Sequence, residues 1–235
     1  MTESVGGRRS IPPVQRVEQV PSASGGPVSG SALLVPVKAF TEAKQRLRDA
    51  LDDNDRIELA RWCAERVLRA AGSLPVYVVC DDPVVAQWAA DLGAGVIICS
   101  EPGLNVAVEQ GLATLASAGI STAVVCHGDL PLAVSFDHVL DGHSPAAGLI
   151  TVVPDHRYDG TNTLVLPTSL AGKFAFHYGR GSFRKHVVEA LGHCPTVRVL
   201  RVDELAHDLD TPDDLIDPRM EEVRQWLQTN RANRR

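Results

Sequence analysis

The sequence predicts a doubly wound α/β domain with a mostly parallel sheet. Short apolar runs rich in valine and isoleucine alternate with longer amphipathic segments. Strands that are buried on both faces read as such runs, and helices between them allow neighbouring strands to be parallel. Past Pro131 the strands follow one another more closely, so the second half of the domain is predicted to be mixed.

The first half of the domain supplies four strand predictions and three helix predictions. Residues 54–71 place apolar side chains three and four positions apart behind an Asp or Asn cap, as an amphipathic helix does. Pro83 suits the first turn of the next helix. The predicted strands are 31–37, 76–80, 96–99 and 122–126, and the predicted helices are 54–71, 83–92 and 105–118.

The second half continues with the strands 148–153, 163–166 and 196–200 and the helices 182–191 and 211–228. Residues 1–30 are rich in Gly, Pro and Ser without an apolar period, so a disordered N-terminal tail is expected. We expect a single domain over 31–228 and a flexible C-terminal tail over 229–235.

Composition excludes several classes of protein. The formal net charge of −6 gives no overall basic field for nucleic acid, and the sequence lacks a membrane span or a secretory signal. The five cysteines have no CxxC spacing and read as buried, reduced thiols, so a cytoplasmic protein is expected. A small anionic substrate therefore needs a local positive site.

Asp129 is the first candidate site residue. It follows the strand 122–126 in the turn Cys126-His-Gly-Asp-Leu-Pro131, at the sheet edge where open α/β domains bind ligands. A carboxylate there can hold Mg²⁺ through one oxygen while substrate phosphates supply further ligands. The alternative is an Asp that makes only a local turn bond.

Asp208 and Asp210 form a second candidate pair. In an extended segment both carboxylates point to the same side, so both could face one cation. With Asp129 they make a metal triad only if the fold brings them together. The segment 211–214 is explained by capping alone, with Thr211 as N-cap and proline at the first helical position.

Positive charge gathers after the first strand, at Lys38, Lys44, Arg46 and Arg48. Loops after strands one and four of a doubly wound sheet meet at one edge, so this loop could hold nucleotide phosphates opposite Asp129. The alternative is a solvated helix start. Neither a P-loop pattern nor GxGxxG occurs, which argues against P-loop and dinucleotide chemistry.

Gly181 and Ser182 precede an amphipathic run and predict a helix N-terminus that favours an anion, with Arg180 adding charge. Ser182 could equally be an ordinary N-cap. Thr161 and Thr163, in Asp-Gly-Thr-Asn-Thr, could bind the same small phosphorylated acid or be ordinary strand residues.

Six segments together resemble one family. They are PVKAFTEAKQRL, GLNVAVEQGL, GDLP, DGTNTLVLP, GRGSFRKH and HDLDTPDDL, in this order, and they span about residues 31–216. The set resembles the phospholactate or phosphoenolpyruvate guanylyltransferases of coenzyme F-420 biosynthesis (CofC/FbiD type). The resemblance implies a GT-A-like nucleotidyltransferase fold, GTP as donor and Mg²⁺ as cofactor. It implies phosphoenolpyruvate, 2-phospho-L-lactate or 3-phosphoglycerate as acceptor.

The resemblance also implies roles for single residues. Carried over by position, it makes the three aspartates the catalytic and metal carboxylates, and it assigns the other residues to the two substrates. The metal set is Asp129, Asp208 and Asp210; the nucleotide set is Lys38, Lys44 and Asn105; the acceptor set is Thr161, Thr163, Gly181 and Ser182. Arg180 and His127 depart from the family pattern, and the Arg180 guanidinium could suit the acceptor carboxylate.

The implied chemistry is attack of the acceptor phosphate on the α-phosphorus of GTP, with release of pyrophosphate. A phosphate whose second pKa is about 6 is already ionised at neutral pH, so no general base is needed. A molybdenum cofactor guanylyltransferase-like enzyme and a non-catalytic nucleotide-binding module remain as alternatives. Assembly into a homodimer is left open.

Overall fold

A seven-stranded sheet forms the centre of the protein, for which a computed structural model describes residues 30–143, 148–194 and 196–234. The strand order is β3-β2-β1-β4-β6-β5-β7. The strands are β1 (Ser31–Pro36), β2 (Val76–Cys80), β3 (Gly95–Ile98), β4 (Thr122–Cys126), β5 (Leu149–Pro154), β6 (Thr161–Pro167) and β7 (Thr196–Val199). The expected N-terminal tail lies outside the described residues except for Gly30.

The sheet is parallel except for one strand. β1 pairs in parallel with β2 and β4, β2 with β3, and β5 with β7, whereas β6 runs antiparallel between β4 and β5. This confirms the predicted mostly parallel sheet with a mixed second half. Because β6 is reversed, its amino end at Thr161 lies at the same edge as the carboxyl end of β4, where Cys126 pairs with Thr163.

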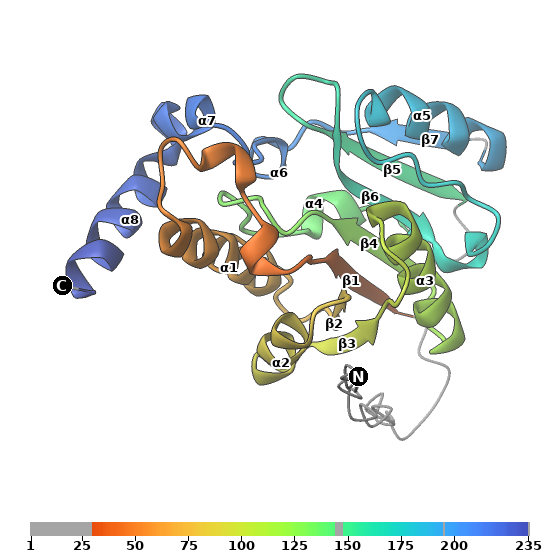
Figure 1. The fold of residues 1–235 in the computed structure, drawn as a ribbon. Coiled ribbons are helices and arrows are strands. Elements are labelled where there is room, and N and C mark those ends of the chain that lie inside the picture. Colours follow the sequence, from red (N-terminus) through yellow and green to blue (C-terminus); the bar gives the residue numbers. More distant parts are fainter. Residues whose placement is uncertain (1–29, 144–147, 195, 235) are drawn as a thin grey trace, which may run out of the picture.

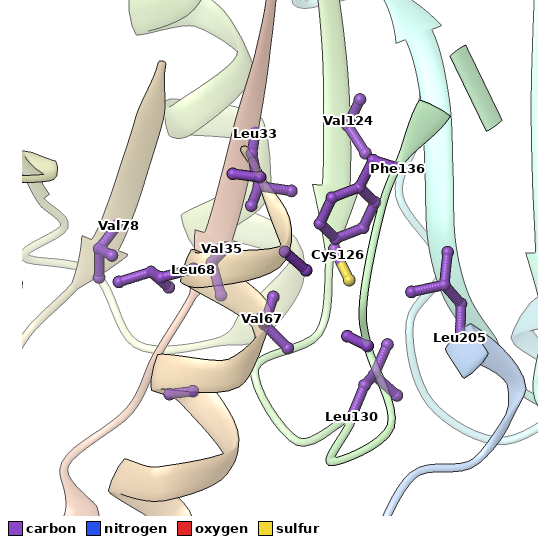
Figure 2. Packing of buried hydrophobic residues seen from close by; sticks show 14 of the residues in the cluster. Leu33, Val35, Val67, Leu68, Val78, Val124, Cys126, Leu130, Phe136 and Leu205 are labelled. Atoms are coloured by element: carbon purple, nitrogen blue, oxygen red, sulfur yellow. The ribbon is translucent and has the colours of Figure 1, made fainter. Parts of the chain in front are cut away.

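Helices cover both faces of the sheet (Figure 1). Side chains from α1 (Asp53–Ala70), α2 (Pro83–Asp91), α4 (Asp137–Leu140) and α6 (Asp203–Ala206) share one apolar cluster with one face. Side chains from α3 (Leu104–Ser117) and α5 (Ser182–His193) share a second cluster with the opposite face. Figure 2 shows the first cluster, in which Val67 and Leu68 of α1 pack near Val35 of β1.

The start of α1 follows from its sequence, because the Asp52 side chain accepts a hydrogen bond from the N–H of Asp55 and caps the helix. The side of α1 that faces away from the sheet is also covered. Leu59 and Cys63 share a third cluster with Val223 and Leu227 of α8 (Glu221–Asn233). The C-terminal helix is therefore a further layer beyond α1 (Figure 1).

The end of the chain differs from the sequence prediction in two ways. The single helix expected over 211–228 is divided into α7 (Pro212–Ile216), a 3₁₀ turn and α8, because Pro218 keeps Asp217 out of the helical conformation. The stretch from residue 229, expected to be a tail, is helical up to Asn233, where α8 ends. Arg231 of this stretch binds the buried Asp55 at 2.6 Å, and Arg234 binds the same carboxylate.

All five cysteines are buried and free, which confirms the prediction of buried thiols. Burial raises the pKa of Cys63 and that of Cys126 to about 12, so neither forms a reactive thiolate near neutral pH. Among the described residues, no helix is long and apolar enough to cross a membrane.

Close packing of α3 on β1 generates a stability prediction. A Cβ atom added at Gly111 would lie 2.6 Å from Leu34 Cδ2. We expect Gly111→Ala to lower the free energy of unfolding by about 1–3 kcal/mol, as overpacking does. Gly192→Ala in α5, where nothing lies within 4 Å of the added atom, is the control and should leave stability equal or slightly higher. Urea unfolding followed by tryptophan fluorescence measures both, and equal stability of the two variants would contradict the prediction.

Candidate active site

A cavity of about 590 Å³ opens at the carboxyl edge of the parallel strands. Its walls come from the segments that follow β1, β2, β3 and β4, together with one residue from the C-terminal part. Polar and charged lining residues are Lys38, Glu42, Lys44, Asp81, Glu101, His127, Asp129 and Asp210. This is the edge at which doubly wound domains bind ligands.

Four of the predicted site residues line this cavity: Lys38, Lys44, Asp129 and Asp210. The other predicted residues lie outside its lining, namely Asn105, Thr161, Thr163, Arg180, Gly181, Ser182 and Asp208. Lys38 is exposed on the loop after β1, where a lysine can reach a bound phosphate. Lys44, in contrast, is buried.

Lys44 is fixed within the protein. Its Nζ donates a hydrogen bond of 2.6 Å to the carbonyl oxygen of Leu209 and lies 3.6 Å from Asp129 Oδ2. Burial lowers the pKa of Lys44, but the charges of Asp129 and the other nearby acids outweigh it and raise that pKa above its ordinary value. The side chain is therefore a permanent internal cation. Its backbone is left-handed, with φ of 55°, which is uncommon outside glycine.

The segment around Leu209 is attached directly to the end of β4. The N–H of Leu209 donates to the carbonyl oxygen of Asp129 at 3.1 Å, and the Leu209 carbonyl accepts from Lys44. Burial raises the pKa of Asp129, but Lys44 and then His127 outweigh it, so that the pKa lies below its ordinary value. Asp129 is therefore ionised, with Lys44 beside it.

Asp208 and Asp210 flank Leu209 and belong to the same electrostatic neighbourhood. Burial, followed by the charges of Asp129 and Asp210, raises the pKa of Asp208 to about 6. Burial and Asp129 also raise the pKa of Asp210, although Lys44 and Arg46 oppose this, with Arg46 Nη1 at 3.7 Å from Asp210 Oδ2. Both pKa values are therefore raised first by burial and then by the neighbouring negative charges.

The three aspartates are nevertheless not arranged as a ready-made metal cluster. Among the residues that the structure describes, no group of three His, Cys, Asp or Glu has that arrangement. Like charges repel, and the ammonium of Lys44 lies 3.6 Å from one carboxylate of the three. The metal role of Asp129, Asp208 and Asp210 stays a prediction.

The segment after Asp210 forms the predicted cap. The Thr211 side chain and Asp214 complete a capping box at the start of α7, with proline at the first position. Asp214 Oδ2 accepts from the N–H groups of Asp210 and Thr211 at 2.9 and 2.7 Å, and its other oxygen binds Arg157 at 3.0 Å. The cap thus fixes the backbone of Asp210 next to the cavity.

The predicted acceptor residues connect β6 with α5. Ser182 is the first residue of α5 rather than its N-cap, which is Gly181 with φ of 70°. The Ser182 hydroxyl accepts from the N–H of Thr161 at 3.0 Å, and Thr161 Oγ1 lies 3.0 Å from His186 Nδ1. Thr163 Oγ1 donates to Cys126 Sγ at 3.4 Å. From the sequence, Ser182 is expected either to bind the acceptor or to be an ordinary N-cap, and neither expectation includes these tertiary partners.

Asn105 is also engaged elsewhere, because its Oδ1 accepts a hydrogen bond of 2.7 Å from the N–H of Tyr178. The start of α3 reaches the cavity through Gly103, Leu104 and Ala107 instead. Asp81 and Glu101, after β2 and β3, were missed as cavity residues. They could have been predicted in the same way as Asp129, because residues that directly follow parallel strands lie at the same edge of the sheet.

The fold is shared with a class of solved structures, the nucleotidyltransferases and nucleotide-diphospho-sugar transferases. One such solved structure, a putative nucleotide-diphospho-sugar transferase from Desulfovibrio desulfuricans G20, has a TM-score of 0.61 and 13% identity, and the match covers 87% of this chain and 96% of that one. At this identity the likeness shows the fold.

The sequence comparisons identify the family. The model described as "Guanylyl transferase CofC like" matches residues 31–222, and the chain belongs to this family. It is 36% identical over 189 residues to a phosphoenolpyruvate guanylyltransferase of Rubrobacter xylanophilus, covering 77% of this chain and 90% of the relative. A relative of the same name from Sphaerobacter thermophilus is 34% identical over 188 residues, covering 77% and 89%. The chain is thus an enzyme of the nucleotidyltransferase type, as the sequence predicted.

Burial of Asp208, together with the carboxylates beside it, predicts a pH dependence of stability. An unfolded Asp loses its proton near pH 3.8, whereas Asp208 in the folded protein keeps it up to about pH 6. The folded state is therefore stabilised below pH 4, and this contribution is lost as the pH rises through 6. In metal-free buffer at pH 7.5, Asp208→Asn should exceed the wild type in unfolding free energy by about 1–3 kcal/mol, since one pKa unit corresponds to about 1.4 kcal/mol.

The difference between Asp208→Asn and the wild type should shrink as the pH falls to 4. Urea unfolding at a series of pH values in EDTA measures it. Asp49→Asn, at an exposed turn, is the control and should follow the wild type at every pH. A pH-independent difference would show that burial and the neighbouring carboxylates do not raise the pKa of Asp208 in the folded state.

Proposed function

We propose that this enzyme transfers GMP from GTP to phosphoenolpyruvate, or to the related acids 2-phospho-L-lactate or 3-phosphoglycerate, and releases pyrophosphate in coenzyme F-420 biosynthesis. The observation that carries the proposal is a strand-edge cavity that combines Lys38 with Asp129 and Asp210, in a member of a guanylyl transferase family. The curated relatives named phosphoenolpyruvate guanylyltransferase favour phosphoenolpyruvate as the acceptor.

The nucleotide has room in the cavity. Lys38 is exposed and available to the phosphates, whereas Lys44 keeps Asp129 and the Leu209 segment in place beneath them. Asp81 and Glu101 supply carboxylates on the wall beyond β2 and β3. A carboxylate can accept hydrogen bonds from the N–H groups of a guanine edge.

The carboxylates fit a magnesium ion in their chemistry. Carboxylate oxygens are the protein ligands that Mg²⁺ prefers, and Asp129 Oδ1 is buried without a hydrogen-bond partner in the described part of the chain. Asp129 and Asp210 would hold the ion, with Asp208 adding negative charge beside them. Bound there, Mg²⁺ neutralises charge on the phosphates during transfer.

The reaction forms a bond between an acceptor phosphate oxygen and the α-phosphorus of GTP. The bond from that phosphorus to the bridging oxygen of pyrophosphate breaks, and pyrophosphate leaves with the electron pair. Because the attacking oxygen is already ionised, the protein's task is to align the two substrates and to stabilise charge. Lys38 contributes to the stabilisation of charge.

Product analysis tests the function directly. The protein is incubated with each of the four ribonucleoside triphosphates and with phosphoenolpyruvate, 2-phospholactate, 3-phosphoglycerate or phosphoglycolate, with Mg²⁺ or with EDTA. We expect mass spectrometry to detect a guanosine diphosphate-linked acid only with GTP and Mg²⁺. GTP binding without turnover would indicate a nucleotide-binding module. A parallel incubation with molybdopterin tests the other alternative, and turnover with that acceptor alone would indicate a molybdenum cofactor enzyme.

The carboxylate roles give a mutational prediction. Asp129→Asn and Asp210→Asn should each lower kcat by at least about a hundredfold, because each removes charge from the proposed metal site. Circular dichroism should show an intact fold. The control is Asp213→Asn, an exposed acid in the first turn of α7 outside the cavity lining, which should keep wild-type turnover. Turnover of Asp210→Asn equal to the wild type would remove this residue from the site.

A further inference from the structure

Three buried polar atoms near the end of β4 have no hydrogen-bond partner in the described part of the chain. They are Asp129 Oδ1, His127 Nε2 and the Tyr178 hydroxyl. Buried polar groups are nearly always hydrogen-bonded, and leaving one unpaired destabilises the folded state. A site that binds a polar ligand is one place where such atoms are retained.

These atoms belong to side chains that are neighbours in space. His127 lines the cavity, and its Nδ1 lies 4.0 Å from Asp129 Oδ1. The ring of His127 packs against the ring of Tyr178 with centroids 5.1 Å apart. The side chains with unpaired atoms therefore extend from Asp129, at the proposed reaction centre, through His127 to Tyr178 in the segment that precedes α5.

Tyr178 is held in position from several sides. Its N–H donates to Asn105 Oδ1 at 2.7 Å, and its ring packs edge-on against His186 with centroids 4.8 Å apart. His186 is itself fixed at both ring nitrogens, by the N–H of His177 at 2.9 Å and by Thr161 Oγ1 at 3.0 Å. Burial raises the pKa of Tyr178, so its hydroxyl keeps its proton and remains a donor.

The hydroxyl groups that were predicted to bind the acceptor already have hydrogen-bond partners within the protein. Ser182 binds the N–H of Thr161, Thr161 contacts His186, and Thr163 binds Cys126. Among the side chains of this region that the structure describes, the buried donors without a partner are the hydroxyl of Tyr178 and the ring nitrogen of His127. An anionic oxygen is the partner that accepts hydrogen bonds from both.

We propose that the Tyr178 hydroxyl and His127 Nε2, in its N–H tautomer, donate hydrogen bonds to an anionic oxygen of the acceptor acid. The inference rests on the proposed function and adds two acceptor-binding residues to it. Asn105 and His186 are positioning residues, because they fix Tyr178 without contacting the substrate. Asn105, predicted in the nucleotide pocket, then acts on the acceptor side through Tyr178.

Tyr178→Phe tests the inference because it removes only the hydroxyl. We expect the KM for phosphoenolpyruvate to rise about tenfold or more, as loss of a hydrogen bond to a charged group does, while the KM for GTP stays within twofold. The melting temperature should be unchanged or higher, since an unpaired buried hydroxyl is removed. Tyr158→Phe, at an exposed tyrosine, is the matched control and should behave as the wild type.

His127 has a conservative pair of variants. His127→Gln keeps an amide N–H near the position of Nε2, whereas His127→Phe keeps the ring and lacks the donor. We expect His127→Phe to raise the acceptor KM like Tyr178→Phe, and His127→Gln to recover most of the loss. Unchanged acceptor KM in both Tyr178→Phe and His127→Phe would overturn the inference.

Calorimetric titration with phosphoenolpyruvate, 2-phospholactate and 3-phosphoglycerate separates this inference from the proposed function. If the wild type forms product and the Phe variants keep its acceptor KM, the inference is wrong and the function stands. If the wild type binds one acid and Tyr178→Phe binds it tenfold more weakly, but no product forms with any nucleotide, the inference stands and the function is wrong. Absence of both binding and product with all three acids overturns both.

Discussion

The contacts of the Lys44 ammonium group hold together the segments that form the active-site edge of the sheet. This group joins the loop after β1 to the Leu209 carbonyl and lies beside Asp129, so that three distant segments of the chain meet at one cation. Asp208 and Asp210 add two further carboxylates to this place. Lys44 offsets part of the repulsion between these carboxylates, which their partial burial strengthens by limiting the screening by water.

The antiparallel direction of β6 determines which of its residues lie at the active-site edge of the sheet. A parallel strand in that position would present its carboxyl end here, whereas β6 presents Thr161 and Thr163 next to Cys126. Thr161 then connects the sheet to α5, through Ser182 and His186, whereas Thr163 binds Cys126 of β4. The site thus has a charged side built on parallel strands and a largely neutral, hydrogen-bonded side built around the antiparallel one.

The strands and the location of the site could be predicted from the sequence, because both depend on local pattern and on the edge rule for parallel sheets. The hydrogen-bond partner of each polar side chain could not be predicted from the sequence. A serine that follows a glycine at the start of an amphipathic run has the pattern of a helix cap. The hydrogen bond between Ser182 and Thr161 forms only because β6 lies beside the start of α5. Likewise, Asn105 and Tyr178 are 73 positions apart, and no local signal indicates their contact. The break before α8 was predictable, since Pro218 was visible.

The bond between Lys44 and Leu209 spans 165 positions, so it forms only after most of the chain has been synthesised. During translation β1 through β4 can already be present, with Lys38 and Lys44 at their edge, while Asp208 and Asp210 are still absent. In such a nascent chain the cavity lining already holds Glu42, Asp81, Glu101 and Asp129 beside the two lysines. The segment with Asp208 and Asp210 therefore adds its carboxylates late, beside a cavity whose walls come mainly from the first half of the protein.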